Sequence, residues 1–119
     1  MSLPLERVKK VAFIDSSLKK AFEELQSGKH EDKQLAEFIQ RAINDLKENP
    51  LCGIKIPSGL WPKEYIKKYG IDNLRKYDLP DGWRLLYTLR GNDVEIISIL
   101  IEWLNHTEYE RTFKYSKNK

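Results

Sequence analysis

The chain has 119 residues, with 21 Lys and Arg against 18 Asp and Glu, a formal net charge of +3 and one cysteine. This length supports one hydrophobic core, so we expect a single domain over residues 1–119 and no separate cofactor domain. One cysteine excludes an intramolecular disulfide and favours the reducing cytoplasm, where Cys52 is expected to be a small buried filler. With no apolar run of roughly 20 residues, no membrane span is expected.

The positive charge is concentrated in two blocks. Residues 53–77 carry six Lys and Arg against two Asp and Glu, and residues 111–119 carry four against none. Residues 78–110, in contrast, carry two against seven. Clustered cations attract polyanions in a salt-dependent way, so the two blocks favour a nucleic-acid partner; the alternative is a set of solvated surface lysines.

The first third of the chain predicts one strand and two amphipathic helices. Alternating side chains over Val8–Ile14 are typical of a strand. Asp15 or Ser16 is a suitable N-cap for a helix whose apolar residues recur at helical spacing until Gly28. After a polar turn over residues 28–32, the same spacing predicts a longer helix that ends before Asn49 and the proline that follows. The two helices form a hairpin whose apolar stripes must cover a sheet.

The middle of the chain adds a short strand and a short helix. Gly53–Ile56 is a strand candidate, and Trp61-Pro62 opens a helical segment that Gly70 ends. We expect this segment, which carries Tyr65 and Tyr69, to lie across the surface as an insertion.

Three further strands predict an antiparallel meander. Asn73–Leu79, Trp83–Arg90 and Val94–Trp103 alternate as strands do, with strong turn signals at Pro80-Asp81-Gly82 and Gly91-Asn92. The fold class is therefore α+β: an N-terminal helical hairpin packed on a twisted, mainly antiparallel sheet of four to five strands. One face of that sheet is expected to remain open.

Parity on the strand Trp83–Arg90 separates core from surface. One face of this strand carries Trp83, Leu85, Tyr87 and Leu89, which belong to the core. Arg84 projects from the opposite face, with whichever of Lys55, Arg75 and Lys76 matches its parity. Such a cationic surface on rigid strands suits a phosphodiester backbone.

The order of these elements, with the segments DLKENP, GIKIP, NLRKYDLPDGWRLLYTL and the terminal HTEYER, resembles the RelE/ParE superfamily of toxins from type II toxin–antitoxin systems. The resemblance runs from Val8 to Tyr115. It implies a RelE-like α+β fold, a cognate antitoxin as partner and no cofactor. RelE-type members enter the ribosomal A site and cleave mRNA without a metal, whereas ParE-type members poison DNA gyrase.

The resemblance also suggests site residues. Arg84 occupies the strand position of a phosphate-binding arginine, and His106 and Tyr109 match the terminal His and Tyr of the HxxY-type RelE-like members. Metal-free RNA cleavage needs a deprotonated 2′-hydroxyl, a stabilised pentavalent phosphate and a protonated leaving oxygen. We therefore expect a metal-independent, ribosome-dependent mRNA endoribonuclease with Arg84, His106 and Tyr109 as catalytic residues.

Each of these residues has an expected role. Arg84 stabilises the phosphate through its planar donors. His106 is the general acid or base, since imidazole ordinarily titrates near neutral pH, and Tyr109 stacks on a base or orients the phosphate. The roles of His106 and Tyr109 can be exchanged. Contacts to the RNA backbone are expected from Lys55, Arg75, Lys76 and Arg111.

Alternatives stay open at the level of single residues. Arg84 can instead pair with Asp78 or Glu102 on a neighbouring strand, and Tyr109 can pack against Phe113 as ordinary core. Glu102 is itself a candidate base. His30 is expected to be a solvated loop residue.

Alternatives also stay open for the function. The chain can be a ParE-like gyrase-binding toxin, or a catalytically inactive homologue that binds nucleic acid without cutting it. Trp61, Tyr65 and Tyr69 are expected either to dock an arm of the antitoxin or to form a covered satellite core.

Overall fold

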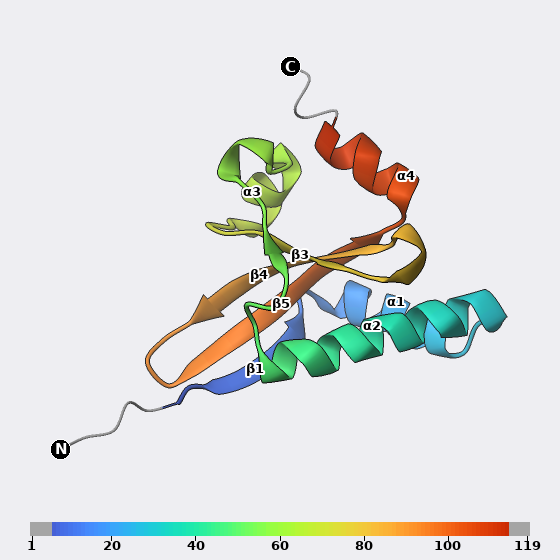
Figure 1. The fold of residues 1–119 in the computed structure, drawn as a ribbon, viewed down its shortest axis with the longest axis horizontal. Coiled ribbons are helices and arrows are strands. Elements are labelled where there is room, and N and C mark those ends of the chain that lie inside the picture. The colour runs from blue at the N-terminus through green and yellow to red at the C-terminus, as the bar shows by residue number, and fades with distance from the viewer. Residues whose placement is uncertain (1–5, 115–119) are drawn as a thin grey trace.

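The computed structural model describes residues 6–114, which form five strands and four α-helices (Figure 1). Tyr115, where the sequence resemblance ends, lies outside the described residues. The strands are β1 (Val8–Phe13), β2 (Ile54–Lys55), β3 (Arg75–Asp78), β4 (Arg84–Gly91) and β5 (Glu95–Leu104). The helices are α1 (Ser16–Gln26), α2 (His30–Glu48), α3 (Lys63–Tyr69) and α4 (His106–Tyr109), which continues as a wider π-helical turn over Glu110–Lys114.

The strands form one sheet in the order β1-β5-β4-β3-β2. Neighbours among β2, β3, β4 and β5 are antiparallel, so the predicted meander is confirmed. β1 joins the far edge of β5 in parallel, with Val8 opposite Glu95. The predicted fold class, an α+β fold with a helical hairpin on a mainly antiparallel sheet, is therefore confirmed.

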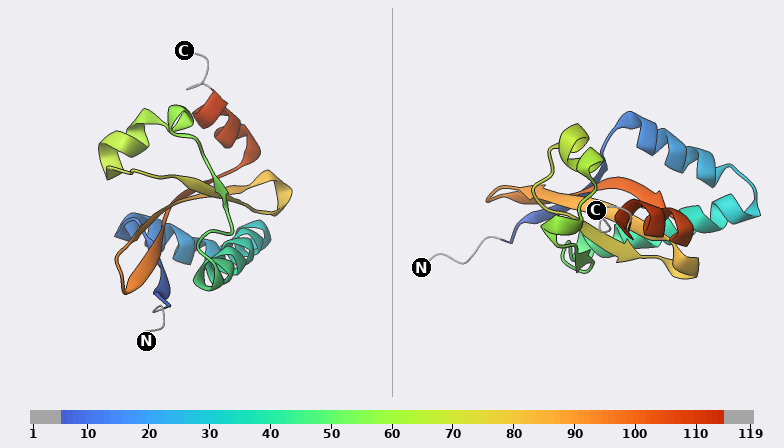
Figure 2. Two further views of the ribbon diagram at one scale, coloured as in Figure 1. Left: turned by 60° about the vertical axis from the view of Figure 1, so that its left-hand side comes forward. Right: turned by 90° about the horizontal axis from the view of Figure 1, so that it is seen from above.

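The hairpin of α1 and α2 covers the first face of the sheet and forms the main core with it (Figure 2). Asp15 is the N-cap of α1, where its Oδ1 accepts a hydrogen bond from the Leu18 N–H at 2.8 Å. α2 already begins at His30, so the turn between the helices is shorter than predicted, and His30 is an exposed helix-start residue. Leu85 and Tyr87 of β4 are fully buried against this hairpin, as parity predicted.

The second face of the sheet is not open, and that expectation is wrong. α3 and the C-terminal helical segment lie on this face, opposite the hairpin (Figures 1 and 2). They enclose a second core made by Ile56, Tyr65, Ile71, Leu74, Leu86, Ile101, Leu104 and Phe113. Burying each of these large apolar side chains is worth about 2 kcal/mol, which explains why the segment from Ile56 to Leu74 lies against this face of the sheet.

A β-bulge in β5 changes which side chains reach this second face. Leu86 pairs with Glu102 and Tyr87 pairs with Leu100, so Ile101 is an extra residue in β5. Strict alternation would have placed Glu102 on the hairpin side with Leu100. The bulge instead turns the Glu102 side chain to the second face.

The loop between α2 and β2 is fixed to the first core by polar contacts. The Tyr87 hydroxyl donates to the Pro50 carbonyl at 2.9 Å and accepts the Gly53 N–H at 3.1 Å. A Cβ at Gly53 would lie 2.6 Å from the Lys76 carbonyl oxygen, so the strand can approach this closely only with glycine there. Because these contacts use the backbone, the Cys52 side chain is left exposed, and its predicted burial is wrong.

Candidate functional site

Two cations and one carboxylate meet where β3 ends and β4 begins. Lys76 and Asp78 lie two residues apart on β3, and Asp78 is directly opposite Arg84 in the ladder, so all three side chains share the second face. Asp78 Oδ1 lies 2.9 Å from Lys76 Nζ and 3.1 Å from Arg84 Nε. Asp78 thus bridges two cations that would otherwise repel each other, and the group keeps one net positive charge.

The ring of Tyr109 lies over both cations. Arg84 Cζ is 5.3 Å and Lys76 Nζ 5.6 Å from the ring centroid, distances at which a π-face attracts a cation. The Tyr109 ring also stacks on the Phe113 ring, with the two ring centroids 4.6 Å apart. Burial raises the pKa of the Tyr109 hydroxyl, while the neighbouring Arg84 charge partly opposes that rise. Tyr109 therefore packs on Phe113, as the alternative held, and its ring also faces the two cations.

His106 is held at the start of α4 by its local sequence. Asn105 Oδ1 accepts the Glu108 N–H at 2.8 Å, and the Glu108 carboxylate accepts the Asn105 N–H at 2.9 Å, which makes a capping box. Leu104, two residues before His106, is paired with Arg84. His106 is exposed, and it lies three residues before Tyr109 on the same short helix.

The turn before β4 also touches His106. Gly82 has φ of +81°, a conformation that glycine adopts without strain, and a Cβ added there would lie 3.2 Å from the His106 Cβ. The turn Pro80–Gly82 therefore forms one wall beside the imidazole.

The predicted RNA-binding residues are divided between different parts of the surface. Lys76 joins Arg84, as described. Arg75 lies on the hairpin side, where it donates to the Gly53 and Leu51 carbonyls at 2.8 and 3.0 Å and to the Tyr87 hydroxyl at 3.3 Å. Lys55 is opposite Arg75 at the edge of the sheet and is exposed. Arg111 is exposed on the C-terminal segment, where it lines a pocket to which Arg84 does not contribute.

Of the two acids considered as partners of Arg84, the structure selects Asp78. Glu102 instead accepts a hydrogen bond from the Tyr65 hydroxyl, and burial raises its pKa. Asp78 was recognisable in the sequence, because it alternates with Lys76 and the turn at Pro80–Gly82 places it opposite Arg84. The position of Glu102 had no such signal, since the bulge is not visible in the pattern.

Lys76, Asp78 and Arg84 thus form a small polar cluster beneath the Tyr109 ring. The sheet that carries the cluster is covered on its other face by the helical hairpin, an arrangement consistent with a RelE-like fold. The family described as "ParE toxin of type II toxin-antitoxin system, parDE" matches residues 14–102. The chain therefore belongs to this family, within the ParE/RelE superfamily of toxins of type II toxin–antitoxin systems. Membership implies a cognate antitoxin as partner.

The match includes Lys76, Asp78 and Arg84 but ends before His106 and Tyr109. No match was found among curated proteins or among solved structures. Among residues 6–114 there is no group of three or more His, Cys, Asp or Glu able to hold a metal ion. In the same range, no helix is long and apolar enough to cross a membrane.

Proposed function

We propose that this toxin is a metal-independent, ribosome-dependent mRNA endoribonuclease of the RelE type that inhibits translation. The observation that carries the proposal is the meeting of Lys76 and Arg84 beneath the Tyr109 ring, with His106 at the start of the same short helix. Two cations, an aromatic ring and an imidazole are the groups that cleavage through a 2′-hydroxyl uses. A surface for protein contact alone would not need them together.

Each group has a role in that reaction. Arg84 and Lys76 neutralise the charge that develops on the pentavalent phosphate, and Arg84 can do so with two parallel N–H donors. His106 takes the proton of the 2′-hydroxyl or returns one to the departing 5′-oxygen. Tyr109, held by Phe113, orients the phosphate or stacks on the neighbouring base.

The scissile phosphate binds where Asp78 now bridges the two cations. Asp78 is half-exposed, with 47% of its side chain accessible, so it can turn into solvent when a phosphate replaces it. Exposed ion pairs of this kind are worth about 0.5 kcal/mol each, which a phosphate contact can exceed. Lys55 and Arg111, both exposed, extend the attraction for the RNA backbone. Arg75 adds positive potential, although its own hydrogen bonds go to carbonyls and to Tyr87.

The test is induced expression of the natural chain beside Arg84→Ala and His106→Ala, with growth and the 5′ ends of cellular mRNA as readouts. His30→Ala and Arg41→Ala are matched controls, because both residues are exposed on α2, on the hairpin side. Growth arrest with new mRNA ends, lost in both site variants and kept in both controls, supports the proposal. Arrest that needs neither Arg84 nor His106 contradicts it, and circular dichroism of each variant checks that it is folded.

A second candidate, a ParE-type toxin that acts on DNA gyrase, is favoured by the family that matches, which is described as ParE. It predicts arrest without mRNA cleavage, unchanged by His106→Ala, because that residue lies outside the matched region. A chain that binds RNA but neither cuts it nor arrests growth would instead be the inactive homologue.

A further inference from the structure

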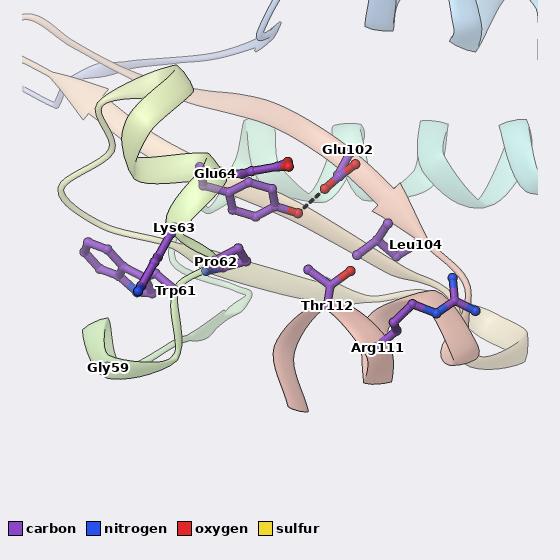
Figure 3. Close-up of a pocket in the computed structure, with 10 residues that line it drawn as sticks. Gly59, Trp61, Pro62, Lys63, Glu64, Glu102, Leu104, Arg111 and Thr112 are labelled. Atoms are coloured by element: carbon purple, nitrogen blue, oxygen red, sulfur yellow. Dashed lines mark hydrogen bonds between the residues drawn. The ribbon is translucent and has the colours of Figure 1, made fainter. Parts of the chain in front are cut away.

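A pocket of about 630 Å³ lies on the second face, between α3 and the C-terminal segment (Figure 3). Its lining comes from three separate parts of the chain: residues 59–65, the end of β5, and Arg111 with Thr112. None of the residues assigned to catalysis lines it, and neither does Lys76. It is therefore a second site rather than part of the first.

Glu102 is the chemical centre of this pocket. The β-bulge at Ile101 is what turns Glu102 to this face, and bulges commonly re-aim a side chain in this way. Its carboxylate accepts a hydrogen bond from the hydroxyl of Tyr65, which is 5% exposed and packs edge-on against Phe113. A buried aromatic ring thus fixes the direction of the carboxylate before any ligand arrives.

Glu102 lies among apolar and acidic side chains, with the cations Lys63, Lys68 and Arg111 in the same region. Among residues 6–114, Glu102 makes no ion pair. Burial raises its pKa, and the nearby Glu64 and Glu108 carboxylates also raise it, while the Tyr65 hydrogen bond and the charge of Lys68 partly oppose the rise. Figure 3 shows Glu64 beside Glu102 at one end of the pocket, whereas the charged ends of Lys63 and Arg111 point away from it. Such a carboxylate gains most from a positive group that brings little water with it.

The walls of the pocket offer apolar surface to the aliphatic chain that would carry the positive group. Trp61 is fixed by its indole N–H, which donates to the Ile56 carbonyl at 2.8 Å, and Pro62 and Leu104 add apolar surface. A guanidinium is planar, weakly hydrated and able to stack on aromatic rings, so it matches these walls better than an ammonium. RNA is a poor match, because the negative groups inside the pocket repel its phosphates.

We propose that this pocket receives an arginine side chain of the antitoxin, with the guanidinium on Glu102 and the stem against Trp61 and Leu104. The partner is the antitoxin because membership of a type II toxin family requires such a polypeptide. The proposal rests on that membership and not on the proposed cleavage of mRNA. It assigns to the α3 side of the sheet a partner contact that is separate from the Lys76–Arg84 site.

The probe for the experiment is Nα-acetyl-arginine amide, titrated into the ¹⁵N-labelled chain and followed by NMR at the Trp61 indole and the backbone of residues 59–65, 102–104 and 111–112. The matched ligand is Nα-acetyl-citrulline amide, which has the same shape without the charge. We expect saturable shifts at these residues with the arginine probe, and binding about tenfold weaker for citrulline and for Glu102→Gln. Glu95→Gln, on the same strand but paired with Lys10, leaves binding unchanged.

Equal binding of the two probes, or shifts spread over the surface and unaffected by Glu102→Gln, overturns the proposal. So does tighter binding of guanosine 5′-monophosphate than of the arginine probe at these residues. If Glu102→Gln does not fold, the proposal is tested by comparing the binding of the arginine and citrulline probes to the natural chain. None of these results depends on mRNA cleavage, so the endoribonuclease proposal can fail while this one stands, and the reverse.

Discussion

Replacing Asp78 by Asn should increase the affinity of the candidate active site for RNA. Asp78 forms ion pairs of 2.9 Å with Lys76 and 3.1 Å with Arg84, so it competes with a phosphate for both cations. Each pair is partly exposed and worth about 0.5 kcal/mol, which makes the competition worth about 1 kcal/mol. The dissociation constant for RNA should therefore fall about fivefold.

The salt dependence of binding gives a second, independent readout. Asp78→Asn leaves two uncompensated cations at the site, so one more phosphate charge is neutralised on binding. The slope of log affinity against log salt should become steeper by about 0.7, the value per phosphate for single strands. A 2′-O-methyl RNA oligonucleotide, which cannot be cleaved through its 2′-oxygen, allows both quantities to be measured by fluorescence anisotropy.

The matched control is Asp93→Asn, which changes the net charge by the same amount in the exposed turn between β4 and β5. If both variants gain affinity equally, the effect is one of overall charge and the reasoning about Asp78 is refuted. If Asp78→Asn gains nothing, the phosphate does not bind between Lys76 and Arg84. The cost of the substitution to folding, up to about 1 kcal/mol from the freed like charges, is checked by urea unfolding.

Two further predictions concern stability. Tyr87→Phe removes a buried hydroxyl that bonds the Pro50 carbonyl, the Gly53 N–H and Arg75, so it should lower the free energy of unfolding in urea by about 2 kcal/mol. Tyr77→Phe, which loses an exposed hydroxyl bonded to Asp45, should cost clearly less; equal losses would show that the loop does not depend on Tyr87. For Glu102 the pKa is raised in the folded chain, so the folded state becomes less favourable as pH rises from the ordinary carboxyl range through that raised pKa. Glu102→Gln should therefore gain stability relative to the natural chain at pH 7 but not at pH 4, and a gain equal at both pH values would contradict the assignment.

The main elements of the fold follow from short-range patterns that the sequence displays directly. Helical spacing of apolar residues predicted α1 and α2, and Asp15 is the N-cap of α1, one of the two candidates that the sequence offered. The turn residues between the last three strands predicted the meander. Parity on β4 also placed Tyr87 in the core and Arg84 away from it. These features depend on neighbours within a few residues, which is why they were predictable.

The second face was predicted poorly because it depends on contacts between distant segments. Tyr65 and Phe113 are 48 positions apart in the chain, yet their rings are 6.3 Å apart in the core that closes this face. A short helix such as α3 has no stability of its own, so its position is decided by packing that the local sequence does not encode. Of the two expectations for Tyr65, the covered satellite core is confirmed, since its side chain is buried in the second core.

The C-terminal helical segment joins the two sites, and this has a mechanical consequence. Tyr109 lies over Lys76 and Arg84, and Arg111 and Thr112 line the pocket. Phe113 packs against Tyr109 and also against Tyr65, which lines the pocket. A helix this short holds its place through its capping box and through these ring contacts rather than through its own hydrogen bonds. A ligand that fills the pocket therefore contacts the helical segment whose first residue is His106. If RNA binding at the proposed active site depends on the position of this helix, any change that the pocket ligand makes in the affinity for RNA is matched by an equal change that RNA makes in the affinity of the pocket.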